Sequence, residues 1–188
     1  MRSGVLQVIT IVFSVSVALQ FQDCHERNTN ARIGRHALAQ IEAEIASNRA
    51  AVADSLVQLN DTTATMEARR ADAKTLELAT QTTMSFPALY SGAYDAAVAA
   101  GAMRHLPPER SATFARVYKL QSWVSHIQER VITLDLDTVL ALAADTQENR
   151  YSVFLLTLTA YEMVARYFAT LVQVYDATLG GKPLPGAH

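Results

Sequence analysis

An uncharged stretch near the N-terminus constrains the fold of this chain more than any other feature. Between Ser3 and Gln22 there is no ionisable side chain, and Val, Ile, Leu and Phe predominate. As a helix, such a run spans roughly 30 Å, the hydrocarbon thickness of a bilayer. In lipid, only a helix satisfies every backbone N–H within one isolated segment. The stretch therefore predicts a transmembrane helix over 5–22, preceded by a short head of residues 1–4.

Two other interpretations of this stretch remain open. Arg2 supplies the positive charge of a signal peptide, and Ser16-Val17-Ala18 places small residues where a signal peptidase cleaves. Alternatively, the segment is a buried strand or core helix of a soluble protein. The length of the uncharged run favours the membrane helix over both.

Small and polar residues recur along one face of the predicted membrane helix. Thr10, Ser14 and Ala18 are spaced four residues apart, and Gln7 lies on nearly the same face. Small residues let a second helix approach closely, and hydroxyl and amide groups offer it hydrogen bonds. We expect this face to pack against another membrane helix; the alternative is that the hydroxyls bond back to carbonyls of their own helix.

The region 23–181 shows apolar residues at helical spacing. Its first series has one polar interruption, Asn48, and consists of Leu38, Ile41, Ile45, Val52, Leu56 and Leu59. This series indicates a long amphipathic helix that can continue directly from the membrane helix as a stalk. Either the helix breaks near Asn60-Asp61, where Asp61 can cap a new helix, or it continues to about Gln81.

A proline and a glycine delimit the next element. Phe86-Pro87 marks a boundary, because the residue before proline is pushed out of the α region. A short helix is expected from about Pro87 to Ala100, closed by Gly101 in a left-handed conformation.

Two long helices are expected after this turn. The first begins at Pro107-Pro108 and reaches about Ala144, and the second runs from Thr146 or Asn149 to Leu179. Gly180-Gly181 closes the last helix, and residues 182–188 form a flexible tail. The apolar series of the last helix consists of Phe154, Leu158, Tyr161, Val164, Phe168, Leu171 and Tyr175.

These elements together predict the fold class. No segment alternates with period two, so we expect an all-α chain: an N-terminal transmembrane helix, then an antiparallel bundle of three long helices with one or two short ones. The bundle domain, residues 23–181, includes the stalk helix.

Composition and motifs argue against several kinds of chemistry. The net charge of -2 lacks the basic footprint of a nucleic-acid binder. Cys24 is the sole cysteine, and the inward-facing Glu-x-x-His pairs of bundle metal sites are missing, His126 and Glu129 having the reversed order. We expect no cofactor, no metal, no catalytic residue and no enzyme.

Aromatic residues provide the remaining candidate surface. Most of the seven tyrosines fit the apolar faces of the predicted helices. Tyr94, Trp123, Arg166 and Tyr167 are of the residue types that dominate protein interfaces, and we predict that they bind a partner. The alternative for each is ordinary packing.

Two stretches resemble a known family. The run Val15-Ser16-Val17-Ala18-Leu19 is followed by the charged helix Ala39-Gln40-Ile41-Glu42-Ala43-Glu44-Ile45, and Gly92-Ala93-Tyr94-Asp95-Ala96-Ala97 leads through Ala100-Gly101-Ala102 to Leu106-Pro107-Pro108-Glu109. The chain thereby resembles an uncharacterised family of bacterial single-pass membrane proteins, a domain of unknown function with an AYDA-type motif. The resemblance implies a topology in the bacterial inner membrane and no activity. The chain departs from the family at Gln22-Asp23-Cys24, where a tryptophan often follows the anchor.

The side of the membrane is ambiguous. Arg27, Arg32 and Arg35 outnumber Arg2, which favours a cytoplasmic domain. The short head resembles an export signal, and Asp23 with Glu26 offsets two arginines, which favours the periplasm; we lean to the latter.

The function expected from the sequence is structural. We predict a membrane-anchored accessory subunit that binds other integral membrane subunits, or itself, within the lipid bilayer and stabilises a multi-subunit complex, for instance a bioenergetic or photosynthetic assembly. The alternative is a membrane-anchored sensor, whose helical domain binds a small ligand.

Overall fold

The computed structural model describes residues 2–68, 70, 86–142 and 147–184, with side chains left out in 2–25, 134–142, 147–150 and 153. Every regular element within these ranges is a helix, which confirms the predicted all-α class. The elements are α1 (Arg2–Ala68), α3 (Gly92–Ala99), the 3-10 helix η2 (Ala102–His105), α4 (Pro108–Leu142) and α5 (Gln147–Leu179).

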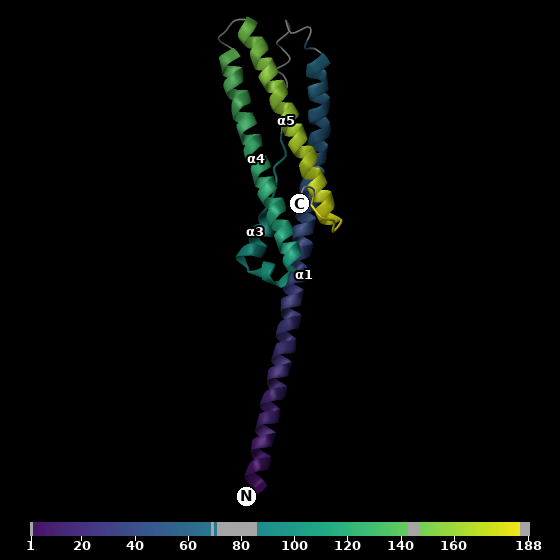
Figure 1. Ribbon diagram of the computed structural model, residues 1–188. Helices are drawn as coiled ribbons and strands as arrows, with labels where there is room; N and C mark the ends of the chain where they lie inside the picture. Colours follow the sequence, from purple (N-terminus) through teal and green to yellow (C-terminus); the bar gives the residue numbers. More distant parts are fainter. Residues whose placement is uncertain (1, 69, 71–85, 143–146, 185–188) are drawn as a thin grey trace.

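Three long helices form the bundle, and the short ones close its base. Figure 1 shows α1 and α4 running in the same direction, with α5 returning antiparallel to both. Helix α5 packs along α1 and along α4, whereas α3 and η2 lie against α1 at the end of the bundle nearer the N-terminus. The predicted antiparallel packing thus holds for α5 against each neighbour. Helices α1 and α4 are parallel because α3 and η2, which precede α4 in the chain, lie at the base of the bundle.

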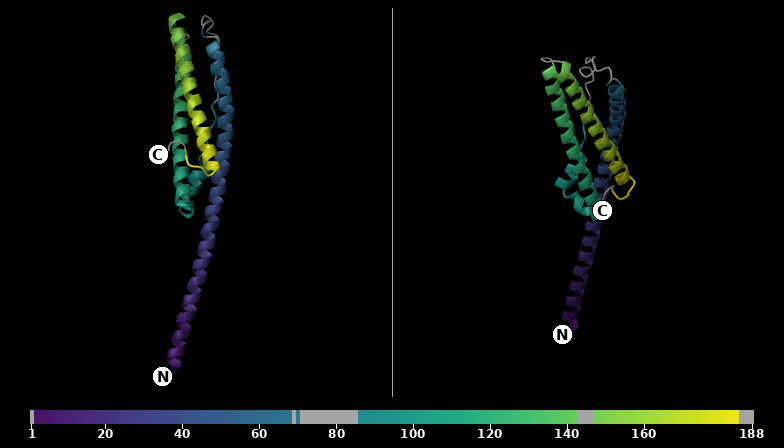
Figure 2. Two further views of the ribbon diagram at one scale, coloured as in Figure 1. Left: turned by 45° about the vertical axis from the view of Figure 1, so that its right-hand side comes forward. Right: turned by 45° about the horizontal axis from the view of Figure 1, so that its top comes forward.

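Helix α1 is a single unbroken helix that extends far beyond the bundle. It passes through Asn60 and Asp61 without interruption, so of the two alternatives the continuous helix is correct as far as Ala68. Its first part, up to about Gly34, projects away from the other elements (Figure 2). The backbone of α1 runs through 5–22 and continues without a break into the bundle. That 5–22 is a transmembrane helix, with a stalk beyond it, stays a prediction.

The side chains of 5–22 lie outside the described set, and with them the predicted packing face of Gln7, Thr10, Ser14 and Ala18. Among residues whose side chains are described, no helix combines the length and the apolar character needed to cross a bilayer.

The bundle core is built from the apolar series read in the sequence. On α1, Ile41, Ile45, Val52 and Leu59 are fully buried, while Leu38 and Leu56 are half-buried against them. All seven predicted core residues of α5 are buried, which confirms that series. Helix α4 contributes Phe114, Val117, Tyr118, Val124 and Val131. Burial of this continuous apolar face is the main force that holds the three helices together.

An extended segment replaces about the first third of the predicted short helix. Residues 86–91 are not helical, and α3 begins only at Gly92, so the expected start near Pro87 is wrong. The reason lies in the neighbouring helices: the N–H and C=O of Tyr90 bond to the Asn48 side chain of α1 and the carbonyl also bonds to Gln121 of α4. These side chains supply the hydrogen bonds that a helix would otherwise provide. We call residues 86–91 the strap.

Two glycines end helices as predicted. Gly101 has φ 66° between α3 and η2, and Gly181 has φ 64° after α5. Beyond α5, Lys182 N–H donates to the Ala177 carbonyl at 2.8 Å and Gly181 N–H to the Thr178 carbonyl at 3.3 Å. This pair of bonds is the Schellman arrangement, which requires a left-handed residue where Gly181 stands.

The base of the bundle is held by a close approach at Gly34. A Cβ placed on this residue would lie 2.6 Å from the backbone oxygen of His105, at the end of η2. Ala37, three residues after Gly34, and Ala102, three residues before His105, are both buried. Their small side chains allow α1 and η2 to lie close together. Any side chain at position 34 would force the two helices apart.

Candidate interaction surface

Trp123 of α4 and Tyr167 of α5 form one exposed aromatic pair. Their ring centroids are 4.5 Å apart at an interplanar angle of 79°, an edge-to-face contact that aromatic rings prefer. Trp123 nevertheless leaves 48% of its surface exposed, and Met163, one helical turn before Tyr167, leaves 40%. The structure thus brings together two of the four residues predicted to bind a partner.

The third predicted residue, Tyr94, belongs to a different cluster. Its ring stacks on Tyr118 with centroids 4.3 Å apart, next to the α3 N-terminus. The Tyr118 hydroxyl donates to Glu44 Oε1 at 2.6 Å, and the Ala93 N–H donates to Glu44 Oε2 at 2.9 Å. This cluster joins α1, α3 and α4, and Tyr94 therefore has a packing role in the structure.

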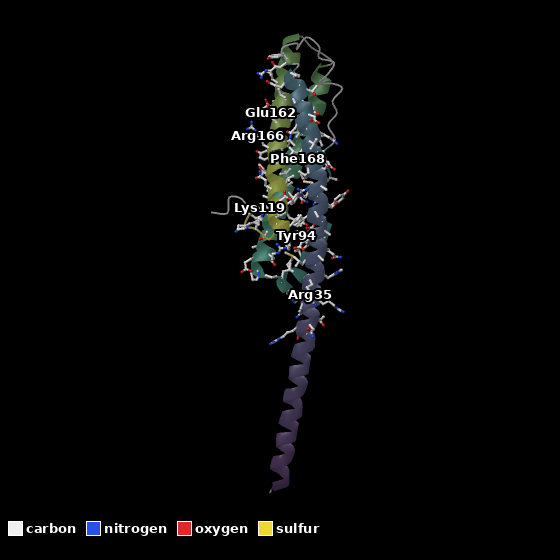
Figure 3. All side chains as sticks on the ribbon, turned by 90° about the vertical axis from the view of Figure 1, so that its right-hand side faces the viewer. Arg35, Tyr94, Lys119, Glu162, Arg166 and Phe168 are labelled. Atoms are coloured by element: carbon white, nitrogen blue, oxygen red, sulfur yellow. The ribbon has the colours of Figure 1, made fainter. Side chains whose placement is uncertain are left out.

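The fourth residue, Arg166, lines an open groove between α1 and α5. The groove has a volume of about 340 Å³ and is lined by Leu56, Asn60, Thr63, Glu162, Ala165, Arg166 and Ala169. Figure 3 shows Glu162 and Arg166 one turn apart on α5. The small side chains of Ala165 and Ala169 leave the space, and the two opposite charges border it. Arg166 is thus separate from the aromatic pair, although Tyr167 follows it directly in the chain.

A buried polar cluster that the sequence did not predict lies at the centre of the bundle. Asn48 Nδ2 donates to Gln121 Oε1 at 3.1 Å, and the Tyr175 hydroxyl donates to the same oxygen at 2.7 Å. Gln121 Nε2 donates to the Tyr90 carbonyl at 2.8 Å. Asn48, Gln121 and Tyr175 come from α1, α4 and α5, so the cluster joins all three long helices to the strap. Two members had a sequence signal: Asn48 is a polar residue in an otherwise apolar series, and Tyr175 belongs to the predicted apolar series of the last helix.

Two tyrosines of the core are held in their neutral form. Burial raises the pKa of Tyr118 far above its ordinary value, and the hydrogen bond to Glu44 raises it further. Burial also raises the pKa of Tyr175, with a smaller contribution from the charge of Glu44. Both hydroxyls act as hydrogen-bond donors, which the ionised form cannot do.

A second three-helix connection runs through Arg110 at the start of α4. Its guanidinium donates to the Thr178 carbonyl at 2.9 Å and forms an ion pair with Glu42 of α1. The same group lies 5.2 Å from the centroid of the Phe114 ring. Because the last carbonyls of α5 carry partial negative charge, a cation at this position stabilises the helix end.

Among the described residues, we find no cluster of side chains typical of a metal site. No three His, Cys, Asp or Glu side chains among them lie together as metal ligands. His126 Nδ1 is 3.4 Å from Glu129 Oε2, and both side chains are largely exposed on α4, consistent with a surface contact. The features that remain are the aromatic pair and the groove.

Comparisons with protein-family models, curated proteins and solved structures found no match to this chain. The resemblance to a bacterial single-pass membrane family stays a prediction.

Proposed function

We propose that this protein is a membrane-anchored accessory subunit, whose bundle docks onto another membrane protein through the Trp123–Tyr167 pair. The observation that carries the proposal is the course of α1. The helix leaves the bundle at about Gly34 and continues without a break to Arg2, through the uncharged segment 5–22. This part of α1, some 30 residues long, projects away from the other described elements (Figure 2) and gains little stability from the bundle, so its apolar stretch needs another environment. A bilayer provides one.

The aromatic pair supports the second half of the proposal. Trp and Tyr bury large areas with few rotatable bonds, and they dominate the binding energy of protein interfaces. Tyr167 is half-buried and forms an edge-to-face contact with Trp123. This contact already holds the exposed indole in one orientation. Little conformational entropy is then lost when a partner covers it.

Membrane extraction and native electrophoresis of the full chain test this function. We expect the protein to stay in the membrane pellet at alkaline pH and, after mild detergent extraction, to migrate in an assembly larger than the monomer. Trp123→Ala should release the monomer. Leu156→Ala is the matched control, since Leu156 is 49% exposed on α5 and lies outside the pair. A wild-type chain found in the supernatant, or only as a monomer, would contradict the proposal.

The groove between α1 and α5 favours a second candidate, a sensor for a small ligand. Its volume of about 340 Å³ is at the lower end of the range of ligand pockets. Glu162 and Arg166 offer it one charge of each sign, which suits a zwitterion such as an amino acid. A thermal-shift titration with free amino acids tests this: a rise in melting temperature that Arg166→Gln removes would support the sensor, and no rise with any of them would exclude this ligand class.

A further inference from the structure

Four arginines gather where α1 leaves the bundle. Arg27, Arg32 and Arg35 are exposed on α1, and Arg104 is exposed on η2. Contact between Gly34 and the His105 backbone brings η2 beside this part of α1, so that Arg104 joins arginines some seventy positions earlier in the chain. Figure 3 shows Arg35 at this place, just above the free part of α1. We call these four residues the basic collar.

The four arginines of the basic collar form no ion pairs within the described part of the chain. No carboxylate there forms an ion pair with any of the four guanidinium groups; Arg104 Nε donates only to His105 Nε2, at 3.2 Å. Glu42, the next acidic residue along α1 after Glu26, already pairs with Arg110. Residues 26–36 carry three arginines against one glutamate. Like charges so close together repel one another, and an external anion relieves that repulsion.

The height of the basic collar along α1 matches the surface of a bilayer. At about 1.5 Å per residue, Arg27 stands roughly 7 Å beyond Gln22, and Arg35 roughly 20 Å beyond it. The headgroup layer is about 5–8 Å thick on each side. With 5–22 in a bilayer, Arg27 would lie among headgroups, and the extended side chains of Arg35 and of Arg104 on the adjacent η2 would end within about one Debye length, some 10 Å, of the headgroup surface.

We propose that the basic collar binds anionic lipid headgroups and thereby holds the base of the bundle against the membrane surface. The inference rests on the proposed anchor, since it requires 5–22 to lie in the bilayer. Arg27, at the height of the headgroups, can donate two parallel hydrogen bonds from its guanidinium group to phosphate oxygens. Arg35 and Arg104 are attracted to the anionic surface over a longer range. Arg104 is the diagnostic residue, because η2 is held beside Gly34 of α1 only in the folded bundle. An anionic lipid surface therefore attracts the folded state more strongly than the unfolded state and stabilises the folded state.

Unfolding of the full chain in liposomes tests the proposal. Trp123, the sole tryptophan, reports the loss of its contact with Tyr167, so its fluorescence follows the melting of the bundle. Replacing part of the phosphatidylcholine with phosphatidylglycerol should raise the melting temperature by about 3 °C at low salt and by little at high salt. Arg104→Gln should remove most of this rise without lowering stability in pure phosphatidylcholine. Arg116→Gln, an exposed arginine of α4, is the matched control and should keep the rise.

Three outcomes decide between the proposals. A chain that does not float with the liposomes contradicts the membrane anchor and the collar together. A chain that floats, but melts at the same temperature in both lipids, overturns the collar alone. Inorganic phosphate added to pure phosphatidylcholine liposomes should not reproduce the rise; if it does, the collar is a site for free anions and the lipid proposal is wrong.

Discussion

The side-chain amide of Asn48 forms hydrogen bonds with both backbone groups of Tyr90. Its nitrogen donates to the Tyr90 carbonyl at 2.7 Å, and its oxygen accepts from the Tyr90 N–H at 3.0 Å. The Asn48 side chain of α1 thus supplies the two hydrogen bonds that a neighbouring strand or helical turn would otherwise provide to the Tyr90 backbone. Gln121 bonds to the same carbonyl from α4, so the strap is attached to two helices that run parallel to each other.

Replacement of Asn48 by leucine should lower the free energy of unfolding by about 2 kcal/mol. Leucine has the same branched side-chain shape, but it leaves the Tyr90 N–H without its partner and removes a donor from Gln121. Urea denaturation followed by Trp123 fluorescence measures the change. Gln58→Leu on the exposed side of the same helix is the control and should change stability by less than about 0.5 kcal/mol. Equal effects of the two substitutions would mean that the amide has no special role.

Gly34 and Gly92 should respond in opposite ways to alanine. Alanine normally stabilises a helix relative to glycine by up to about 1 kcal/mol. At Gly34 its Cβ would lie 2.6 Å from a backbone oxygen of His105, whereas at Gly92 the nearest atom is Glu44 Oε2 at 3.8 Å. We expect Gly34→Ala to lower the melting temperature and Gly92→Ala to leave it unchanged or raise it. A stabilised Gly34→Ala variant would show that α1 and η2 do not pack as described.

Alkaline pH should unfold the bundle through Tyr118 and Tyr175. The pKa of each is raised by burial in the folded state, and free tyrosines ionise near pH 10. Above about pH 10 the unfolded chain loses protons that the folded chain keeps, so the free energy of unfolding falls as pH rises. Titration of tyrosinate absorbance should show at least two of the seven tyrosines ionising only when the helical circular dichroism signal is lost. The double variant Tyr118→Phe/Tyr175→Phe should be less stable at pH 7 but lose less of its stability between neutral and alkaline pH.

Arg110 should contribute more to stability than Arg49, although both form ion pairs between helices. Arg110 is partly buried and bonds to Glu42 and to the Thr178 carbonyl, so Arg110→Met should cost about 1–2 kcal/mol. Arg49 pairs with Asp176 at 2.7 Å, but both side chains are about half exposed, and Arg49→Met should have little effect. Denaturation at low and high salt measures both. A larger loss for Arg49→Met would reverse this ranking.

The long helices could be predicted because their signal is local. Each apolar series repeats within a few residues, and a helix buries the face that the series marks, as Ile41, Ile45 and Val52 show on α1. The same holds for the closing glycines, since Gly101 and Gly181 occupy the left-handed positions that helix ends favour. These helices and helix ends can be predicted without knowing which residues elsewhere in the chain contact them.

The strap could not be predicted because its hydrogen-bond partners are distant. Nothing in residues 87–91 disfavours a helix strongly, and the extended form depends on Asn48 and Gln121, 42 and 31 positions away from Tyr90. The polar Asn48 was visible in the apolar series, but a backbone partner carries no sequence signature. Similarly, Trp123 and Tyr167 were each named, but their contact depends on the register of α4 against α5.

The unbroken course of α1 fixes the rotational setting of the bundle about its own stalk. Each residue of an α-helix turns the chain by about 100°, so one residue inserted between Asn28 and Ile33 would turn everything before it by that angle relative to Trp123. Seven inserted residues would nearly restore the original angle and lengthen the rod by about 10 Å. The stalk therefore sets both the rotational angle and the height of the aromatic pair relative to the N-terminal part of α1. Insertions of graded length would separate the effect of the angle from the effect of the height.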